Sequence, residues 1–152
     1  MASEINYTFK EKNGEILHLD FNGDQKEFKF VCKIDFNSDR KRMSVIMKDL
    51  RTGRFYLFCK GADSIMLKKL QEETPLYLLE KVKDDLNTFS TEGLRTLVIA
   101  YKELDEEKYL DWSQRYSEAQ AEEFNVAGAC DHIEKLNQVN LEKYVSLCVF
   151  FS

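Results

Sequence analysis

Three short segments of the chain combine cations with an aromatic ring or a glycine, and each lies at the end of an apolar run. The first is residues 35–44, DFNSDRKRMS, in which Phe36 is followed five residues later by Lys41. A ring and a cation at this spacing offer a stacking surface and a positive charge to one ligand, and a purine base with its phosphates would suit both. The alternative is that Phe36 closes the core face of its strand while the charged residues form a solvated turn.

The second segment is residues 58–63, FCKGAD, where a strand is expected to pass into a helix. Gly61 would let a ligand approach the backbone, and the first N–H groups of the helix would attract an anion. Lys60 is placed to reach a phosphate or the edge of a ring. The alternative is a strand-to-helix corner that needs glycine for its backbone dihedrals.

The third segment is residues 92–97, EGLRTL, in which Arg95 opens an apolar strand. A cation flanked by apolar residues on both faces is predicted to need a partner, since an unpaired buried charge costs several kcal/mol. Either Glu92 or a ligand phosphate would satisfy Arg95.

Several familiar catalytic and binding motifs are missing from the sequence. The six glycines form neither GxxxxGK[ST] nor GxGxxG, and there is no HExxH or GxSxG. The four cysteines form no CxxC pair, so they are interpreted as reduced core cysteines, with structural disulfides as the alternative. No carboxylates stand out from a solvated face by their spacing, and a catalytic carboxylate pair formed only in three dimensions is left open. We assign neither catalytic nor metal-binding residues to this chain.

Composition narrows the class of protein further. The 152 residues carry a formal net charge of −5, which argues against a general nucleic-acid binder. No run approaches the ~18 apolar residues of a membrane helix, so no direct membrane insertion is expected. We expect one domain over residues 1–152, monomeric in isolation.

The first half of the chain has the alternation and turn residues of β-strands. Strands are predicted over residues 5–11 and 15–21 around Asn13-Gly14, over 28–36, over 43–48 and over 55–60, the last apolar on both faces and so central. In the third of these, one face is predicted to carry Phe28, Phe30, Cys32, Ile34 and Phe36.

The second half changes to helical spacing. A short helix is predicted over residues 63–70 and a longer one from Thr74 and Pro75 to Gly93, with a strand over 94–101 after it. The apolar stripe of the longer helix is Leu76, Leu79, Val82, Leu86 and Phe89. Asp105 is expected to cap a third helix with Tyr109, Trp112, Tyr116 and Ala119 on one face, followed by a helix near 132–136 and a strand over 144–151. The predicted fold class is α+β, an antiparallel sheet with helices packed on it.

Taken together and in this order, the three segments resemble the nucleotide-binding domain of P-type ATPases. DFNSDRKRMSVI, residues 35–46, resembles the adenine-pocket segment of the phospholipid-flippase subfamily, and KGAD, residues 60–63, resembles the family's KGA motif. EGLRTLVIAYKEL, residues 92–104, is similar to the flippase pattern as well. The family-like part covers residues 5–120, and residues 126–152 form an atypical tail.

The resemblance implies an ATP site. Phe36 would stack on adenine, with Ser38 and Lys41 lining the pocket. Lys60, next to Gly61, would lie against the base and ribose, and Arg95 and Thr96 would lie toward the phosphates. In the resembled pumps the phosphorylated aspartate of a DKTGT segment accepts the γ-phosphate, and magnesium is held mainly outside this domain. Neither that segment nor the family's acidic adenine-pocket stretch is found here, so the chain alone is expected to be inactive.

The implied partners are ATP and the phosphorylation and actuator domains of a parent pump, and the implied location is a cytosolic domain of a multi-pass membrane protein. The chain would be either an excised domain or a truncated gene product. A catalytically silent interaction domain of the same fold, with little ATP affinity, is the alternative function. A nucleic-acid module that uses residues 40–42 is a weaker one.

Overall fold

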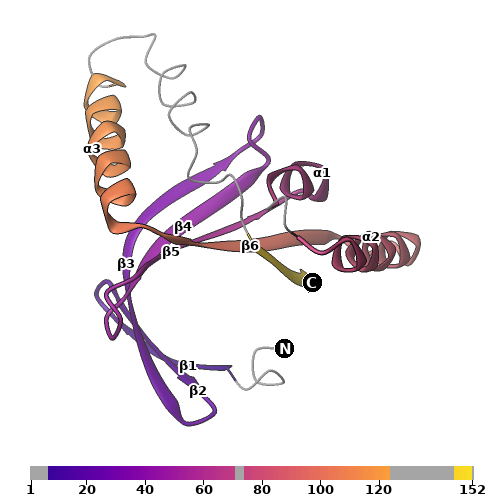
Figure 1. Ribbon diagram of the computed structural model, residues 1–152, viewed down its shortest axis with the longest axis horizontal. Coiled ribbons are helices and arrows are strands. Elements are labelled where there is room, and N and C mark those ends of the chain that lie inside the picture. Colours follow the sequence, from indigo (N-terminus) through magenta and orange to yellow (C-terminus); the bar gives the residue numbers. More distant parts are fainter. Residues whose placement is uncertain (1–6, 71–73, 124–145, 152) are drawn as a thin grey trace.

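A computed structural model describes residues 7–70, 74–123 and 146–151 of the chain. Seven strands form one sheet in the order β1-β2-β3-β4-β5-β6-β7, and every neighbouring pair is antiparallel (Figure 1). The strands are β1 Tyr7–Asn13, β2 Ile16–Phe21, β3 Asp24–Asn37, β4 Arg42–Asp49, β5 Phe55–Gly61, β6 Thr96–Leu104 and β7 Ser146–Phe151. The helices are α1 Asp63–Met66, the 3₁₀ turn η2 Leu67–Lys69, α2 Leu76–Thr91 and α3 Glu106–Glu123. The α+β class predicted from the sequence is confirmed.

The hairpin turns form where the sequence places glycine and short polar residues. Gly14 and Gly23 have φ of 60° and 84°, values that glycine adopts without steric cost. At the β2–β3 turn, Asp20 accepts a hydrogen bond from the Gly23 N–H at 2.8 Å. Turn chemistry of this kind can be read from sequence because it depends on adjacent residues.

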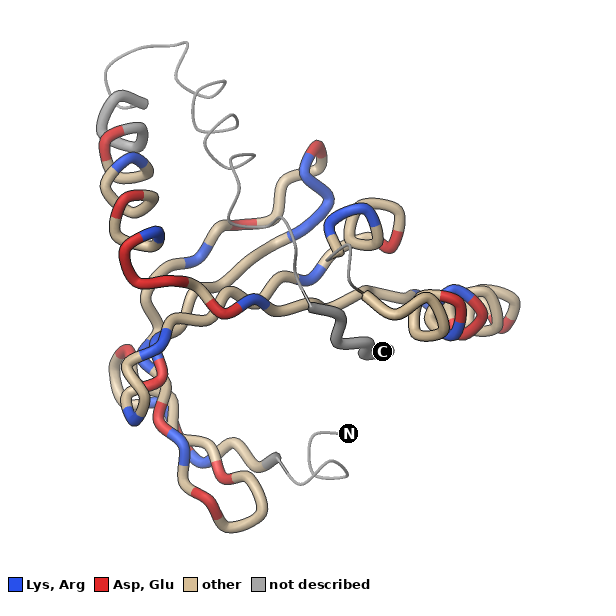
Figure 2. Tube along the Cα trace, in the orientation of Figure 1, with Lys and Arg blue, Asp and Glu red and all other residues tan. Residues whose placement is uncertain are grey.

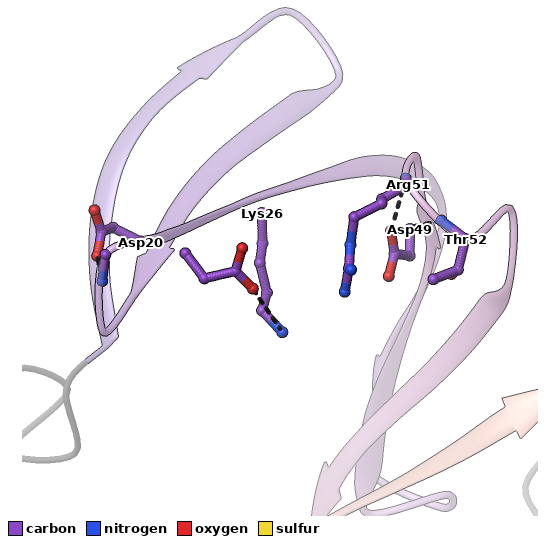
Figure 3. Close-up of polar contacts among 7 residues, drawn as sticks. Asp20, Lys26, Asp49, Arg51 and Thr52 are labelled. Atoms are coloured by element: carbon purple, nitrogen blue, oxygen red, sulfur yellow. Dashed lines mark hydrogen bonds and ion pairs between the residues drawn. The ribbon is translucent and has the colours of Figure 1, made fainter.

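The β4–β5 turn is held by one carboxylate. Asp49 accepts hydrogen bonds from the backbone N–H groups of Arg51 at 2.8 Å and Thr52 at 3.2 Å (Figure 3). Partial burial, the largest influence, would raise the pKa of Asp49. The hydrogen bonds from Thr52 and Arg51, with the positive charge of Arg51, outweigh burial and leave this pKa below its ordinary value.

Strand β3 departs from simple alternation at two places. Its register against β4 shifts between Phe30 and Cys32 and again between Ile34 and Asn37. Each shift is a bulge that adds one residue to β3. The first bulge turns Cys32 and Ile34 to the opposite face from Phe28 and Phe30, so the prediction that all of these share one face is wrong.

The core lies on one face of the sheet, between the strands and the three helices, in two clusters. One cluster joins β3, β4, β5 and β6 to α3, and its buried residues are Ile34, Ile46, Phe55, Leu57, Leu104, Tyr109 and Trp112. The other joins β5 and β6 to α1, η2 and α2, and its buried residues are Cys59, Met66, Leu70, Val82, Leu86, Val98 and Ala100. We call this side of the sheet the helix face and the other side the open face.

Helix α2 begins one residue later than the sequence suggests. Pro75, not Thr74, occupies the N-cap position, and no side chain caps the helix there. Val82 and Leu86 are buried as predicted, but Leu76 is 76% exposed, so the predicted stripe does not extend to the first turn. The helix ends before Gly93, whose φ is 75°.

Helix α3 begins as predicted. Asp105 accepts a hydrogen bond from the Glu107 N–H at 3.0 Å, and Tyr109 and Trp112 are buried on one face. The Tyr109 ring stacks on Phe55 with centroids 4.3 Å apart, which anchors α3 to β5. The helix expected near residues 132–136 and the side chain of Ala119 lie outside the described residues.

Candidate functional site

The three segments singled out from the sequence meet at one end of the sheet. Arg42 pairs with Gly61 across β4 and β5, and Gly61 pairs with Val98 across β5 and β6. The β3–β4 turn, the β5–α1 corner and the beginning of β6 therefore all lie at this end (Figure 1). An antiparallel ladder thus brings together three segments that are far apart in the sequence.

A pocket of about 300 Å³ lies on the sheet near this end. Met43 pairs with Lys60 and Lys60 with Ile99, so one row of the open face runs through the pocket. Its lining residues are Met43, Ser44, Val45, Phe58, Cys59, Lys60 and Ile99. The volume is at the small end of the range for small-molecule sites. A pocket of this size can hold a flat aromatic ring but not a whole nucleoside triphosphate.

The apolar part of this lining was missed by sequence reasoning. Val45 and Phe58 pair directly across β4 and β5, and both are half-buried on the open face. The available signal was that β5 is apolar on both faces, although only its helix face, with Phe55, Leu57 and Cys59, is fully buried. Apolar residues on a sheet face that no helix covers, such as Val45 and Phe58, are available to form the floor of a pocket.

Phe36 is 63% exposed and does not belong to either core cluster. The second bulge of β3 sets Asp35 and Phe36 opposite a single residue, Met43, since Ile34 pairs with Ser44 and Asn37 with Arg42. Met43 lines the pocket. The ladder thus sets Phe36 next to a residue of the pocket lining, although Phe36 itself does not line the pocket. Its exposure excludes the alternative that it closes the core face.

The β3–β4 turn carries Ser38 and Lys41, both exposed. Asn37 shapes the turn, since its side-chain oxygen accepts from the Asp39 N–H and its carbonyl from the Lys41 N–H, both at 2.7 Å. Lys41 adopts a left-handed conformation with φ of 52°. Figure 2 shows the run of cations at residues 40–42 in this turn.

The β3–β4 turn packs against the β5–α1 corner and is hydrogen-bonded to it. The carbonyl of Lys41 accepts a hydrogen bond from the Ala62 N–H at 3.0 Å. A Cβ atom on Gly61 would stand 2.5 Å from the Cβ of Arg42 and 2.7 Å from the Lys41 carbonyl oxygen. Gly61 is therefore required by packing within the chain, whatever its relation to a ligand. Lys60 beside it is exposed and lines the pocket.

Arg95 and Thr96 lie beyond the last pair of the β5–β6 ladder, which is Gly61 with Val98. Arg95 is exposed, so the prediction that it is a buried cation in need of a partner is wrong. The error arose because β6 begins at Thr96, leaving Arg95 outside the strand. Both residues are at the same end of the sheet as Lys60.

Two cysteines, Cys32 and Cys59, are described with their side chains, and neither forms a disulfide. Cys59 is buried, and burial raises the pKa of the half-buried Cys32 thiol. Within residues 7–70, 74–123 and 146–151, no three His, Cys, Asp or Glu side chains form a group that could hold a metal ion. None of the helices there is both long enough and apolar enough to cross a membrane.

The fold and the site define an α+β domain with helices on one face of an antiparallel sheet and, on the other, a pocket that Lys60 lines. Residues 8–139 match the family described as P-type ATPase, cytoplasmic domain N, and the chain belongs to that family. The resemblance noted from the three motifs is confirmed.

Individual relatives point to one branch of that family. Phospholipid-transporting ATPase ID of Homo sapiens is 40% identical over 118 residues, which are 78% of this chain and 10% of the relative. Phospholipid-transporting ATPase dnf2 of Schizosaccharomyces pombe is 39% identical over 76% of this chain and 8% of its own length. Phospholipid-transporting ATPase DRS2 of Saccharomyces cerevisiae is 35% identical over 92% of this chain and 10% of its own length. The chain thus spans about a tenth of these relatives.

Proposed function

We propose that this chain is the ATP-binding domain of a phospholipid-translocating P-type ATPase, where it holds adenine and positions the γ-phosphate for transfer to an aspartate in a separate domain. The observation that carries the proposal is the exposed Phe36, which the β3 bulge sets opposite Met43, a residue that lines the same pocket as Lys60. An aromatic ring that is 63% exposed can stack on a base, because one of its faces is not used for core packing.

The pocket fits the base, and the cations fit the rest of the nucleotide. Four of the lining side chains, Met43, Val45, Phe58 and Ile99, are apolar, which suits a purine ring and not a phosphate. The exposed Lys41, Lys60 and Arg95 lie around the same end of the sheet. With a pocket of about 300 Å³, the triphosphate would extend into solvent toward these cations and toward the neighbouring domain.

In this proposal Ser38 lines the adenine pocket with Lys41, Gly61 contributes its backbone next to Lys60 on the base side, and Thr96 lies with Arg95 toward the phosphates. The chain recognises and positions ATP, while the phosphorylation and actuator domains of the parent pump provide the acceptor aspartate and the conformational cycle. This part of the pump is a cytosolic domain of a multi-pass membrane protein.

Affinity is expected to be low because the site is open. Stacking contributes about 1–3 kcal/mol per base, and exposed cations add modest charge-assisted bonds, while association entropy removes part of the gain. We expect a dissociation constant on the order of 0.1–10 mM. The described residues do not fit a resident magnesium site, so magnesium at constant ionic strength should change this constant by less than about twofold.

The test is a titration of ¹⁵N-labelled protein with ATP, GTP and a short oligonucleotide, observed at the backbone amides. ATP should shift the amides of residues 36–45, 58–61 and 95–99 more than GTP does, and the oligonucleotide should leave them unchanged. No shift with ATP at 10 mM would favour the silent interaction domain. Shifts caused only by the oligonucleotide, confined to residues 38–42, would favour a nucleic-acid module.

A further inference from the structure

The β3–β4 turn buries two arginines where the sequence predicts a solvated charge run. Arg40 and Arg42 are each only 5% exposed, whereas Lys41 between them is exposed. A guanidinium is costly to remove from water unless hydrogen bonds satisfy its donors. The cations of this turn are therefore not equivalent, and only one of the three is presented to solvent.

Each of the two guanidinium groups donates a hydrogen bond to a backbone carbonyl of its own turn. Nη1 of Arg40 donates to the carbonyl oxygen of Asp35 at 2.8 Å, and Nη1 of Arg42 donates to the carbonyl oxygen of Arg40 at 2.9 Å. Asp35 and Phe36 are the two residues of the β3 bulge that face Met43. The carbonyl that Arg40 holds thus belongs to the peptide unit between Asp35 and Phe36.

We infer that Arg40 is a positioning residue for the base: its guanidinium fixes the bulge that presents Phe36 to the pocket. This inference rests on the proposed function. The exposed ring of Phe36 is not held in place by the core, so its direction depends on the backbone of the bulge. A planar guanidinium with several donors can hold that backbone against the turn more rigidly than a flexible ammonium. A ring that is already oriented loses less conformational entropy when the base stacks on it.

A direct contact of Arg40 with phosphate is a different reading, and its burial argues against it. With 5% of its surface exposed, Arg40 has little to offer a ligand in solvent, while Lys41 is open to solvent on the same turn. A general contribution to folding is the second competing role. The experiment must distinguish positioning of Phe36 from phosphate contact and from a general contribution to folding.

A double-mutant cycle with Phe36 makes the separation. ATP affinity is measured by amide titration for the wild type, Arg40→Met, Phe36→Ala and the double variant, each checked for folding by its denaturation midpoint. Arg40→Met should weaken binding on the order of three- to tenfold, since groups that act through one another couple by this much. In the Phe36→Ala background the same change should weaken binding by less than about twofold.

Equal losses in both backgrounds would overturn the inference, as would wild-type affinity for Arg40→Met. Arg54→Met is the matched control, because Arg54 is an exposed arginine beside the opposite end of β5, and it should leave binding unchanged. Should Arg40→Met fail to fold, Arg40→Lys takes its place in the cycle. It keeps the charge but not the planar fork, and full affinity in that variant would contradict the inference.

The outcomes for the two proposals remain distinct. If wild-type protein does not bind ATP, the proposed function fails and the inference about Arg40 falls with it. If the wild type binds ATP at the pocket but the cycle shows no coupling, the inference alone is rejected.

Discussion

Replacing Phe36 with alanine separates ligand stacking from core packing. Full burial of a phenylalanine side chain stabilises a fold by about 1.5–3 kcal/mol, and truncation of a fully buried one typically costs 3–5 kcal/mol. Phe36 is 63% exposed, so a little over a third of its surface is covered. We therefore expect Phe36→Ala to lower the free energy of unfolding by only about 0.5–1 kcal/mol.

The effect on binding should be larger than the effect on folding. Loss of base stacking should weaken ATP binding by about 1–3 kcal/mol, which corresponds to a roughly 5- to 150-fold larger dissociation constant. Urea denaturation gives the first quantity and an ATP titration of the folded variant gives the second. Phe55→Ala is the control, because Phe55 is 5% exposed and stacks on Tyr109 in the core.

The control should show the opposite pattern, with a stability loss of about 3–5 kcal/mol and near-normal ATP affinity in whatever fraction stays folded. The reasoning is refuted if Phe36→Ala unfolds as readily as Phe55→Ala, or if it folds normally and binds ATP as the wild type does. Phe30, which the sequence pattern places on the same strand face as Phe36, is only half-buried and is a less suitable control.

Four further predictions follow from individual contacts. Lys60→Ala should weaken ATP binding with less than about 0.5 kcal/mol change in stability, because an exposed cation at a strand end contributes little to folding; unchanged ATP affinity would remove Lys60 from the site. Gly61→Ala should cost about 1–3 kcal/mol of stability by overpacking against Arg42, and a melting temperature equal to wild type would contradict the close approach. Because the pKa of Asp49 is depressed in the fold, its stabilisation is complete above the ordinary value of about 3.9 and is lost as pH falls through the folded value. The stability difference between wild type and Asp49→Ala, measured by urea unfolding, should therefore shrink in acid, and a constant difference would argue against the assigned hydrogen bonds. Trp112→Ala should cost about 3–5 kcal/mol with ATP affinity unchanged in the folded protein, since Trp112 packs from α3 into the core on the helix face.

Much of the fold can be predicted from this sequence because its signals are local. The turns at Gly14 and Gly23, the cap at Asp105 and the aromatic face of α3 each depend on residues a few positions apart. The bulge at Val31 could not be predicted in this way. One inserted residue moves every later residue of the strand to the other face of the sheet, but it leaves the apolar residues of the sequence in an apparently alternating pattern. The pattern therefore does not reveal on which face each residue lies.

The candidate site likewise has some features that the sequence indicates and others that depend on tertiary contacts. The three segments could be identified, and their convergence follows from strand ends in one antiparallel sheet. The burial of Arg40 and Arg42 and the exposure of Arg95 depend on tertiary contacts and on where β6 begins, which residue type alone does not indicate. The ligand-binding roles of all seven site residues stay predictions; these residues are Phe36, Ser38, Lys41, Lys60, Gly61, Arg95 and Thr96.

The central claim is that adenine lies in the pocket of the open face, against Phe36. Nuclear Overhauser effects between ATP and the ¹³C-labelled domain test it most directly, because they report protons within about 5 Å of each other. The account predicts effects from adenine H2 and H8 to the Phe36 ring, the Met43 methyl group and the side chain of Ile99. Effects confined to another surface, or none at an ATP concentration that saturates the amide shifts, would contradict it.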